Sequence, residues 1–296
     1  MRKSFARSPA RVCMLASMAI LLYAPSAALA GTLLLTAQSF AVLGASTVTN
    51  TGFSTVSGNL GLYAGTSVTG FPPGTVSQGT IHTTDAVAHR AQIDETNAYV
   101  TLADLALTDN ESGVDLGGQT LHPGVYWFTS SAQVTGGLTL DFQGASNALF
   151  VFQIGSTLTT ASGSSVTVLN GNSTDGIFWQ VGSSATLGTS TTFAGNILSL
   201  DSITLNTSAK IECGRAFAQT GAVTLDTNTI SSDCVANDFG SGRSDFGSGG
   251  FSPASSIPIV TPEPGAFLLL GVGLAGIVAT NSGRRRWAPL RPTEQI

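Results

Sequence analysis

The sequence predicts a mainly β protein, a solenoid of short strands with one long α-helix packed alongside. A Thr-Leu-x-Thr phrase occurs four times, at spacings of roughly 18 to 30 residues, which is typical of a repeat architecture. Many short β-type runs alternate with Gly, Asn and Ser turns. Only one stretch free of Gly and Pro has a helical period. The four phrases begin at Thr157, Thr186, Thr204 and Thr224.

The first 30 residues have the pattern of a secretory signal peptide. Arg2, Lys3, Arg7 and Arg11 precede an apolar run over 12–23, and a small-residue cleavage sequence ends at Ala30. We therefore expect the chain to be exported and cleaved after Ala30.

The C-terminal region divides into three parts. Residues 235–260 form a Gly/Ser-rich linker, 261–287 a sorting or anchor segment, and 288–296 a short tail. The apolar stretch 265–280 would be about 24 Å long as a helix, against a hydrocarbon core of about 30 Å, so we expect only transient membrane contact.

The anchor segment resembles the PEP-CTERM sorting signal of Gram-negative bacteria. It has the same three parts in the same order: Pro262-Glu263-Pro264, the apolar stretch, and Arg284-Arg285-Arg286. The resemblance implies removal by an exosortase-type protease, with the product released to, or attached at, the cell surface.

What remains, 31–234, has the length of one domain. It carries 3 basic and 13 acidic residues, a net charge of −10. So acidic a domain lacks the Lys and Arg that nucleic-acid binding requires. We expect Cys213 and Cys234 to pair, because disulfides persist in exported proteins; two buried thiols are the alternative. Neither cysteine has the neighbours of a zinc site.

The expected helix covers about 84–107. Its apolar residues recur at three- and four-residue steps, and Asp94 with Glu95 is expected on the solvated side. A helix of this length is about 35 Å long, enough to lie across several coils spaced about 4.8 Å apart. The expected apolar stripe is Val87, Ala91, Ala98, Leu102 and Leu105.

The strands after the helix show which faces are buried. Successive side chains of a strand point to opposite faces, so the consecutive apolar residues of 150–152, 177–179 and 197–198 predict strands covered on both sides. We expect the helix to cover one side. In each phrase the Leu should point inward and the preceding Thr outward. Further inward residues are expected at Val166, Phe193, Ile211 and Ile230.

A flat array of outward Thr suggests recognition of ordered water. Thr is stiff at χ1 and shows one methyl and one hydroxyl, and stacked coils would repeat these groups about every 4.8 Å. Such a grid could hold waters in the positions of an ice plane. The alternative is that Thr occurs here for its β propensity and for solubility.

The whole domain resembles the microbial ice-binding proteins, which pair an irregular right-handed β-solenoid with one long helix. The resemblance implies ice binding through one flat face, without cofactor or metal. It rests on stretches at 40–44, 46–52, 69–74, 121–126, 151–158 and 221–230.

Some family members carry a Thr-Ala/Gly-x-Thr/Asn motif on the ice face. Residues 189–192 fit this motif best, whereas 207–210 ends in Lys210 and 160–163 in Gly163. The candidate face residues are Thr157, Thr159, Thr160, Thr186, Thr189, Thr191, Thr192, Thr204, Thr207, Thr224, Thr227 and Thr229.

The alternatives to ice binding are a polysaccharide-cleaving enzyme and a surface adhesin. A polysaccharide lyase or hydrolase would need clustered carboxylates, whereas the aspartates here are scattered as turn caps, so we expect no enzyme activity. The histidines His82, His89 and His122 have no ligand or triad spacing. The stronger rival is a surface adhesin or matrix protein that binds polysaccharide through aromatic platforms. We expect a monomer. The turn aspartates are Asp141, Asp175, Asp201 and Asp226, and the aromatic candidates are Tyr63, Tyr126, Trp127 and Trp179.

Overall fold

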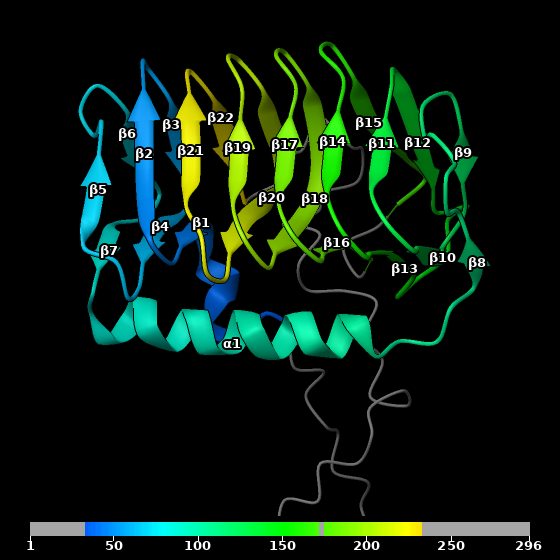
Figure 1. Ribbon diagram of the computed structural model, residues 1–296, viewed down its shortest axis with the longest axis horizontal. Coiled ribbons are helices and arrows are strands. Elements are labelled where there is room, and N and C mark those ends of the chain that lie inside the picture. Colours follow the sequence, from blue (N-terminus) through cyan, green and yellow to red (C-terminus); the bar gives the residue numbers. More distant parts are fainter. Residues whose placement is uncertain (1–32, 172–174, 233–296) are drawn as a thin grey trace, which may run out of the picture.

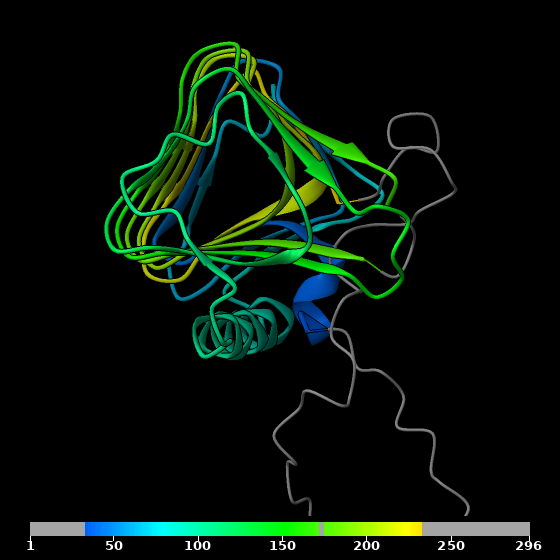
Figure 2. The ribbon, with the colours of Figure 1, turned by 90° about the vertical axis from the view of Figure 1, so that its right-hand side faces the viewer.

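The computed structural model describes residues 33–171 and 175–232, which form a parallel β-solenoid with a single α-helix alongside. The coils have a triangular outline, and the helix lies outside one of the three sides (Figure 2). We call the side under the helix face A and the other two faces B and C. The predicted fold class is thereby confirmed.

Each face is a ladder of parallel strands. Face A is, in spatial order, β8 (Asp109–Asn110), β10 (Gly124–Phe128), β13 (Leu149–Ile154), β16 (Gly176–Val181), the second halves of β18 (Thr192–Ser199) and β20 (Lys210–Ala218), β1 (Phe40–Gly44), β4 (Asn59–Leu62) and β7 (Ile81–Thr83). Face B is β11 (Ala132–Val134), β14 (Leu158–Thr160), β17 (Ala185–Leu187), β19 (Ile203–Leu205), β21 (Val223–Asp226), β2 (Thr47–Thr51) and β5 (Ser67–Thr69). Face C is β9 (Thr120–Leu121), β12 (Gly137–Asp141), β15 (Ser165–Leu169), the first halves of β18 and β20, β22 (Thr229–Ser231), β3 (Thr55–Ser57) and β6 (Thr75–Ser77).

The order of the coils differs from their order in the sequence. The first coil stacks on the last, because β1 pairs with β20, β2 with β21 and β3 with β22. After β7 the helix α1 (Ala86–Ala103) runs along the whole row of coils, so the chain resumes at the far end and winds back (Figure 1).

Strands β18 and β20 each bend from face C into face A. The bend falls at a register shift beside Gly195, whose φ of 99° lies in the region that favours glycine. A Cβ on Gly214 would stand 2.0 Å from the Gly195 carbonyl oxygen, so the two neighbouring coils can turn together only with glycine there.

The solenoid interior holds the main core. Tyr126, Phe152 and Trp179 face one another in successive coils, with ring centroids 5.5 and 3.8 Å apart. The expected inward residues Val166, Phe193, Ile211 and Ile230 are all buried. The consecutive apolar runs are buried on both sides, as predicted, because their alternate residues face α1.

The helix packs on face A through small side chains. Ala91, Ala98 and Leu102 lie against an apolar layer from four neighbouring strands. The helix is shorter than expected, and Val87 was wrongly placed in the apolar stripe, since it is 48 % exposed. The strand residues of the layer are Val151, Phe178, Leu198 and Phe217.

Asp94 and Glu95 lie on the buried side of the helix, which contradicts their expected solvated position. Asp94 accepts hydrogen bonds from the Thr36 hydroxyl (2.5 Å) and backbone N–H (3.2 Å), and it pairs with Arg90 (3.2 Å). It therefore joins the N-terminal 3-10 helix η1 (Leu35–Ser39) to α1. A purely apolar period could not reveal this polar contact.

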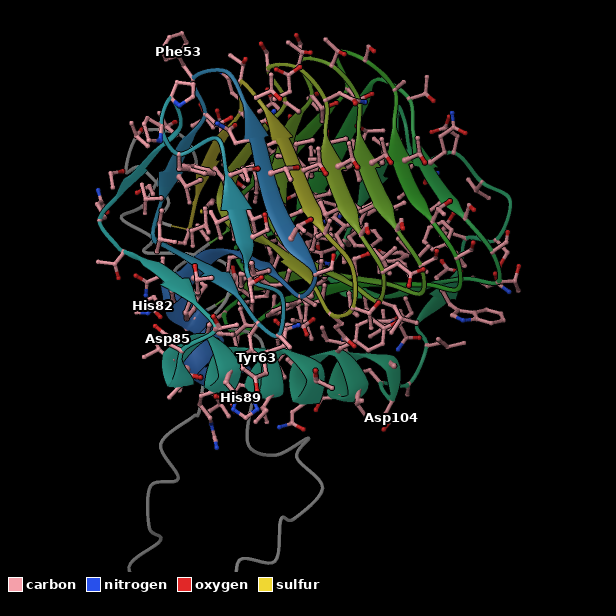
Figure 3. All side chains as sticks on the ribbon, turned by 60° about the vertical axis from the view of Figure 1, so that its left-hand side comes forward. Phe53, Tyr63, His82, Asp85, His89 and Asp104 are labelled. Atoms are coloured by element: carbon pink, nitrogen blue, oxygen red, sulfur yellow. The ribbon has the colours of Figure 1, made fainter. Side chains whose placement is uncertain are left out.

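Side chains satisfy both ends of the helix. The Asp85 carboxylate accepts from the Ala88 N–H (2.8 Å) and from the His82 ring (2.7 Å), near the start of α1 in Figure 3. At the other end the Gln153 side-chain amide donates to the carbonyl of Leu102 (2.7 Å) and to two more carbonyls. Both ends are therefore held to the coils.

Several expectations fall on residues that the structure does not describe. They are the signal peptide over 1–30, the linker 235–260, the sorting segment 261–287 and Cys234. Cys213 is buried in β20 and disulfide-bonded, but the pairing with Cys234 stays a prediction. No helix within the described ranges is long and apolar enough to cross a membrane.

Glu95 makes the stability of the helix contact depend on pH. Its carboxyl accepts one hydrogen bond, from Gln219 (3.2 Å), and burial raises its pKa from 4.5 to about 8. As pH rises, the unfolded chain loses this proton at a lower pH than the folded protein does. The free energy of unfolding should therefore fall as pH rises from about 4.5 to about 8. The Glu95→Gln variant should lack this component, up to about 5 kcal/mol, in urea titrations across that range. Parallel pH profiles for the two proteins would contradict the assignment.

Candidate binding face

The central row of face B is a ladder of outward side chains at one register. The pairing of successive strands places Thr159, Thr186, Thr204, Thr224, Thr49 and Thr69 side by side, with Gln133 at one end. In β14, β17 and β19 the residues directly before and after the Thr are buried, so the Thr side chain itself points away from the core. The strands that carry this row lie to the front in Figure 1.

The hydroxyls of this row are directed to solvent. Thr49 and Thr224 approach each other to 3.5 Å between their oxygens. Within the part of the chain that the structure describes, the hydroxyls of Thr159, Thr186 and Thr204 make no hydrogen bond to the protein. They are therefore free to bind water.

A second row lies two residues earlier, along the corner between faces A and B. Ser131 and Thr157 share a hydrogen bond of 2.8 Å. The Ser202 hydroxyl accepts from the Ala222 N–H (3.1 Å), so part of this row also fixes the backbone of the next coil. The row consists of Ser131, Thr157, Ser184, Ser202, Ala222, Thr47 and Ser67.

Between Thr159 and Thr69 neither row of face B contains a charge. Beyond Gln133 the central row ends at Asp115, whose carboxylate accepts from the N–H groups of Gly117 (2.8 Å) and Thr135 (2.9 Å). The other carboxylates near the face stand at its two corners and are also hydrogen-bonded. Asp201 accepts from the Ser183 hydroxyl (2.9 Å), and Asp226 accepts from the hydroxyls of Thr207 and Thr227. Hydrogen bonding within the protein thus holds these charges to the edges of the face.

Face C differs in its charges. Its central row carries Lys210 between Thr192 and Thr229, and Glu212 lies two residues further along the same strand. Lys210, at which the motif match of 207–210 ends, therefore belongs to face C and not to the Thr ladder of face B.

The predicted face residues fall in four places: face B, the corner between faces B and C, face C, and the solenoid interior. Thr157, Thr159, Thr186, Thr204 and Thr224 lie on face B. Thr189, Thr207 and Thr227 lie exposed at the corner between faces B and C, and Thr192 and Thr229 lie on face C.

Thr160 and Thr191 were wrongly predicted to be exposed. They are 3 % and 0 % exposed, and their hydroxyls bond to each other at 2.8 Å. The first Thr-Leu-x-Thr phrase is displaced by two residues relative to the second, since Leu158 pairs with Ala185 and not with Leu187. A shift of two keeps Thr159 outward but turns Thr160 inward.

The N-terminal coils supply face residues that the repeat could not reveal. Thr49 and Thr69 continue the ladder of Thr224, although Thr49 is 175 residues away from it in the sequence. The only sequence signal is the alternating Thr47-Val48-Thr49, which predicts a strand but not its neighbour.

The acidic and aromatic residues that an enzyme or a polysaccharide-binding adhesin could use have structural roles here. The carboxylates of Asp141 and Asp175 accept from the N–H of Gln143 and of Ala148 (2.9 Å each). Trp179 and Tyr126 are buried. Tyr63 stacks on His89 beside α1, with centroids 4.2 Å apart (Figure 3). Among the described residues no group of His, Cys, Asp and Glu could hold a metal ion.

Together, the fold and the face define a β-solenoid protein with a regular, hydroxyl-lined surface. The Ice-binding-like family matches residues 42–231, and the chain belongs to that family. The PEP-CTERM protein-sorting motif matches residues 260–286, which confirms the predicted sorting signal.

Related proteins with the same name agree with the family match. An ice-binding protein of Nostoc sp. (strain HG1) is 57 % identical over 82 % of this chain and 84 % of its own length. An ice-binding protein of Flavobacterium frigoris (strain PS1) is 32 % identical over 66 % and 74 %. A crystal structure of an ice-binding protein from an Antarctic biological consortium has a TM-score of 0.64 and 47 % identity, over 67 % of this chain and 89 % of that one.

The buried position of Thr160 predicts a stability effect. In the wild type the Thr160 hydroxyl accepts a hydrogen bond from the Gly188 N–H (2.8 Å). Thr160→Val keeps the side-chain shape but leaves this N–H without a partner. We expect a loss of about 1–3 kcal/mol in the free energy of unfolding, measured by urea titration. The neighbouring Thr159→Val is the control and should change it by less than about 0.5 kcal/mol. Equal effects would contradict the inward position of Thr160.

Proposed function

We propose that this ice-binding protein adsorbs to ice through face B. The observation that carries the proposal is the row of six Thr at one register across six successive coils. Their repeat is fixed by the backbone hydrogen bonds between coils, at about 4.8 Å.

The rigidity of the row supports adsorption without rearrangement. Thr is stiff at χ1, and each Thr of the row stands on a strand whose neighbouring residues are anchored in the core. Waters on such a grid occupy a fixed pattern of sites before ice arrives, so little ordering remains to be done on binding. An adsorbed molecule then holds back the ice front, which must curve between neighbouring molecules.

The charges of the molecule favour face B over face C. A Lys or Glu binds its own hydration shell strongly and would interrupt a regular water layer. From Thr159 to Thr69 the two rows of face B have no such group, and Asp115 lies only at the end beyond Gln133, whereas Lys210 and Glu212 stand in the middle of face C. Thr189, Thr207 and Thr227 border face B at its corner, and we assign them a secondary contribution.

The described ends of the chain are compatible with display at a cell surface. Leu33 packs on the helix side of the molecule, and Ser232 directly follows β22 on face C. Neither end lies on face B (Figure 2). A protein exported by its N-terminal leader, sorted through 261–287 and processed by an exosortase-type protease would keep face B free in either the released or the attached form. We propose that it acts as a monomer, without cofactor and without enzyme activity.

The polysaccharide-binding alternative has less support. Its aromatic platforms would have included Trp179 and Tyr126, which lie in the core. What favours it is the sorting motif alone, and an ice-binding protein held at the surface would account for that motif equally well.

Tyr substitutions on different faces test the proposal. Thr204→Tyr places a bulky ring in the centre of face B and should weaken adsorption to ice roughly tenfold, a loss of about 1.4 kcal/mol in adsorption free energy, which is measured as a fall in thermal hysteresis. Thr189→Tyr at the corner should have a smaller effect.

Thr167→Tyr is the matched control, because Thr167 is an exposed residue of β15 on face C. It should behave like the wild type in hysteresis and in ice-crystal shaping. Unshaped ice with the wild-type protein would refute ice binding, and equal activity of Thr204→Tyr and wild type would refute face B.

A further inference from the structure

The outer surface of helix α1 carries apolar side chains that contact no part of the core. Ile93 and Val100 are 41 % and 53 % exposed. They are seven residues apart, so they project two turns from each other on the side of the helix away from face A. Leu35, on η1 beside the helix, and Leu107, beyond its last turn, are exposed as well. We call these four residues the helix patch. Helices η1 and α1 lie together outside face A (Figure 2).

The charge on this side of the molecule differs from that of the rest of the domain. Arg90 is the one fully charged side chain on the exposed surface of α1, because both acids of the helix lie on its covered side. Carboxylates stand at its two ends, on Asp85 and Asp104. In a domain with a net charge of −10, the length of the helix thus presents apolar groups and a cation. This combination suits the boundary between the anionic headgroups and the acyl chains of a bacterial membrane.

The chain end that leads to the sorting motif lies next to the helix side. The Ser232 hydroxyl donates to the Ser57 carbonyl (3.2 Å). A Cβ built on Gly58 would stand 2.8 Å from Ser232 Oγ and 3.1 Å from the Cβ of Ala41, a residue of face A. The described chain therefore ends at the corner between face C and face A, the face that the helix covers.

The chain beyond this corner is long enough to let the helix touch the membrane. The sorting motif covers 260–286, so residues 233–259 join it to the domain. A Gly/Ser-rich segment of this length has an average reach of about 30 Å, similar to the length of α1, which is about 27 Å. A domain held at that distance meets the membrane at an effective concentration of about 1 mM, so even a weak contact is populated.

We propose that helix α1 lies on the surface of the membrane that holds the sorting segment, with the helix patch in the headgroup boundary and Arg90 at an anionic lipid. The ligand is a lipid surface, so the inference goes beyond ice binding and does not depend on it. The contact turns faces B and C away from the membrane, because they are the other two sides of the triangular coil (Figure 2).

The size of the helix patch favours a lipid surface over a second copy of the chain. Stable protein pairs bury about 800 Å² on each partner, which the few aliphatic side chains of one helix do not supply. A membrane contact needs less area, because the inserted sorting segment already holds the domain at the surface.

The test uses the chain 31–296 with its sorting segment, reconstituted into vesicles of phosphatidylethanolamine with a minority of phosphatidylglycerol. An environment-sensitive fluorophore is attached to Thr96→Cys on the exposed side of α1, or to Thr186→Cys on face B. Labelling without reductant spares Cys213, which is disulfide-bonded. The emission of the label at 96 should shift to the blue in vesicles relative to detergent, and that of the label at 186 should not.

The double variant Ile93→Gln/Val100→Gln should lower the ratio of membrane-bound to free helix roughly tenfold, because two half-exposed aliphatic side chains lose their burial. Phe53→Gln is the matched control, since it removes a large exposed apolar side chain from the corner between faces B and C (Figure 3), and it should keep the full shift. Thermal unfolding shows that each variant is folded. The double variant should keep the thermal hysteresis of the wild type.

Three results would overturn the membrane contact. The first is an unshifted label at 96, or an equal shift in the double variant. The second is an equal shift of the labels at 96 and 186, which would mean that the domain has no preferred orientation. The third is a shift that disappears when each vesicle holds a single protein molecule, which would assign the helix patch to a second copy. None of these results bears on face B, because the assay contains no ice.

Discussion

The parallel register between coils is the constraint on which the rest of the structure depends. Each coil is hydrogen-bonded to the next, so one register sets the stacking of the inward side chains and the alignment of the outward ones together. A shift of one residue would exchange core and surface, and a shift of two, as in the coil of Leu158, preserves the faces but changes which Thr is exposed. The Thr ladder is therefore a consequence of core packing as much as of the Thr residues themselves.

The helix makes this register possible for the N-terminal coils. The first coils must join the last ones through β1, β2 and β3, and the chain must therefore cross the full length of the solenoid once. Helix α1 provides that crossing and at the same time covers the outward apolar residues of face A, such as Phe178 and Leu198. Because face A is covered in this way, faces B and C are the sides left for a ligand.

The sequence predicted the parts of the structure that depend on local pattern. Consecutive apolar residues in β13 and β16 correctly indicated a strand buried on both sides, and the single Gly- and Pro-free stretch correctly indicated the covering helix. What it could not predict depends on contacts between distant segments. The pairing of Thr49 with Thr224 has no local signal. Neither has the burial of Glu95, which contacts Gln219, the residue directly after β20 and distant in the sequence. The position of Thr160 was missed because the repeat suggested a register that the coil does not adopt.

The distribution of charge separates the faces more sharply than the distribution of Thr does. Thr and Ser occur on faces B and C alike, because both are exposed β surfaces on which these residues are favoured. Specific partners hold Asp201 and Asp226 at the corners and Asp94 and Glu95 on the covered side of the helix, and Lys210 and Glu212 lie on face C. A surface that must hold water in a fixed arrangement has to exclude groups that impose a hydration shell of their own. In a domain with so few charges, their placement leaves the Thr ladder uninterrupted from Thr159 to Thr69, with Asp115 beyond Gln133 at one end.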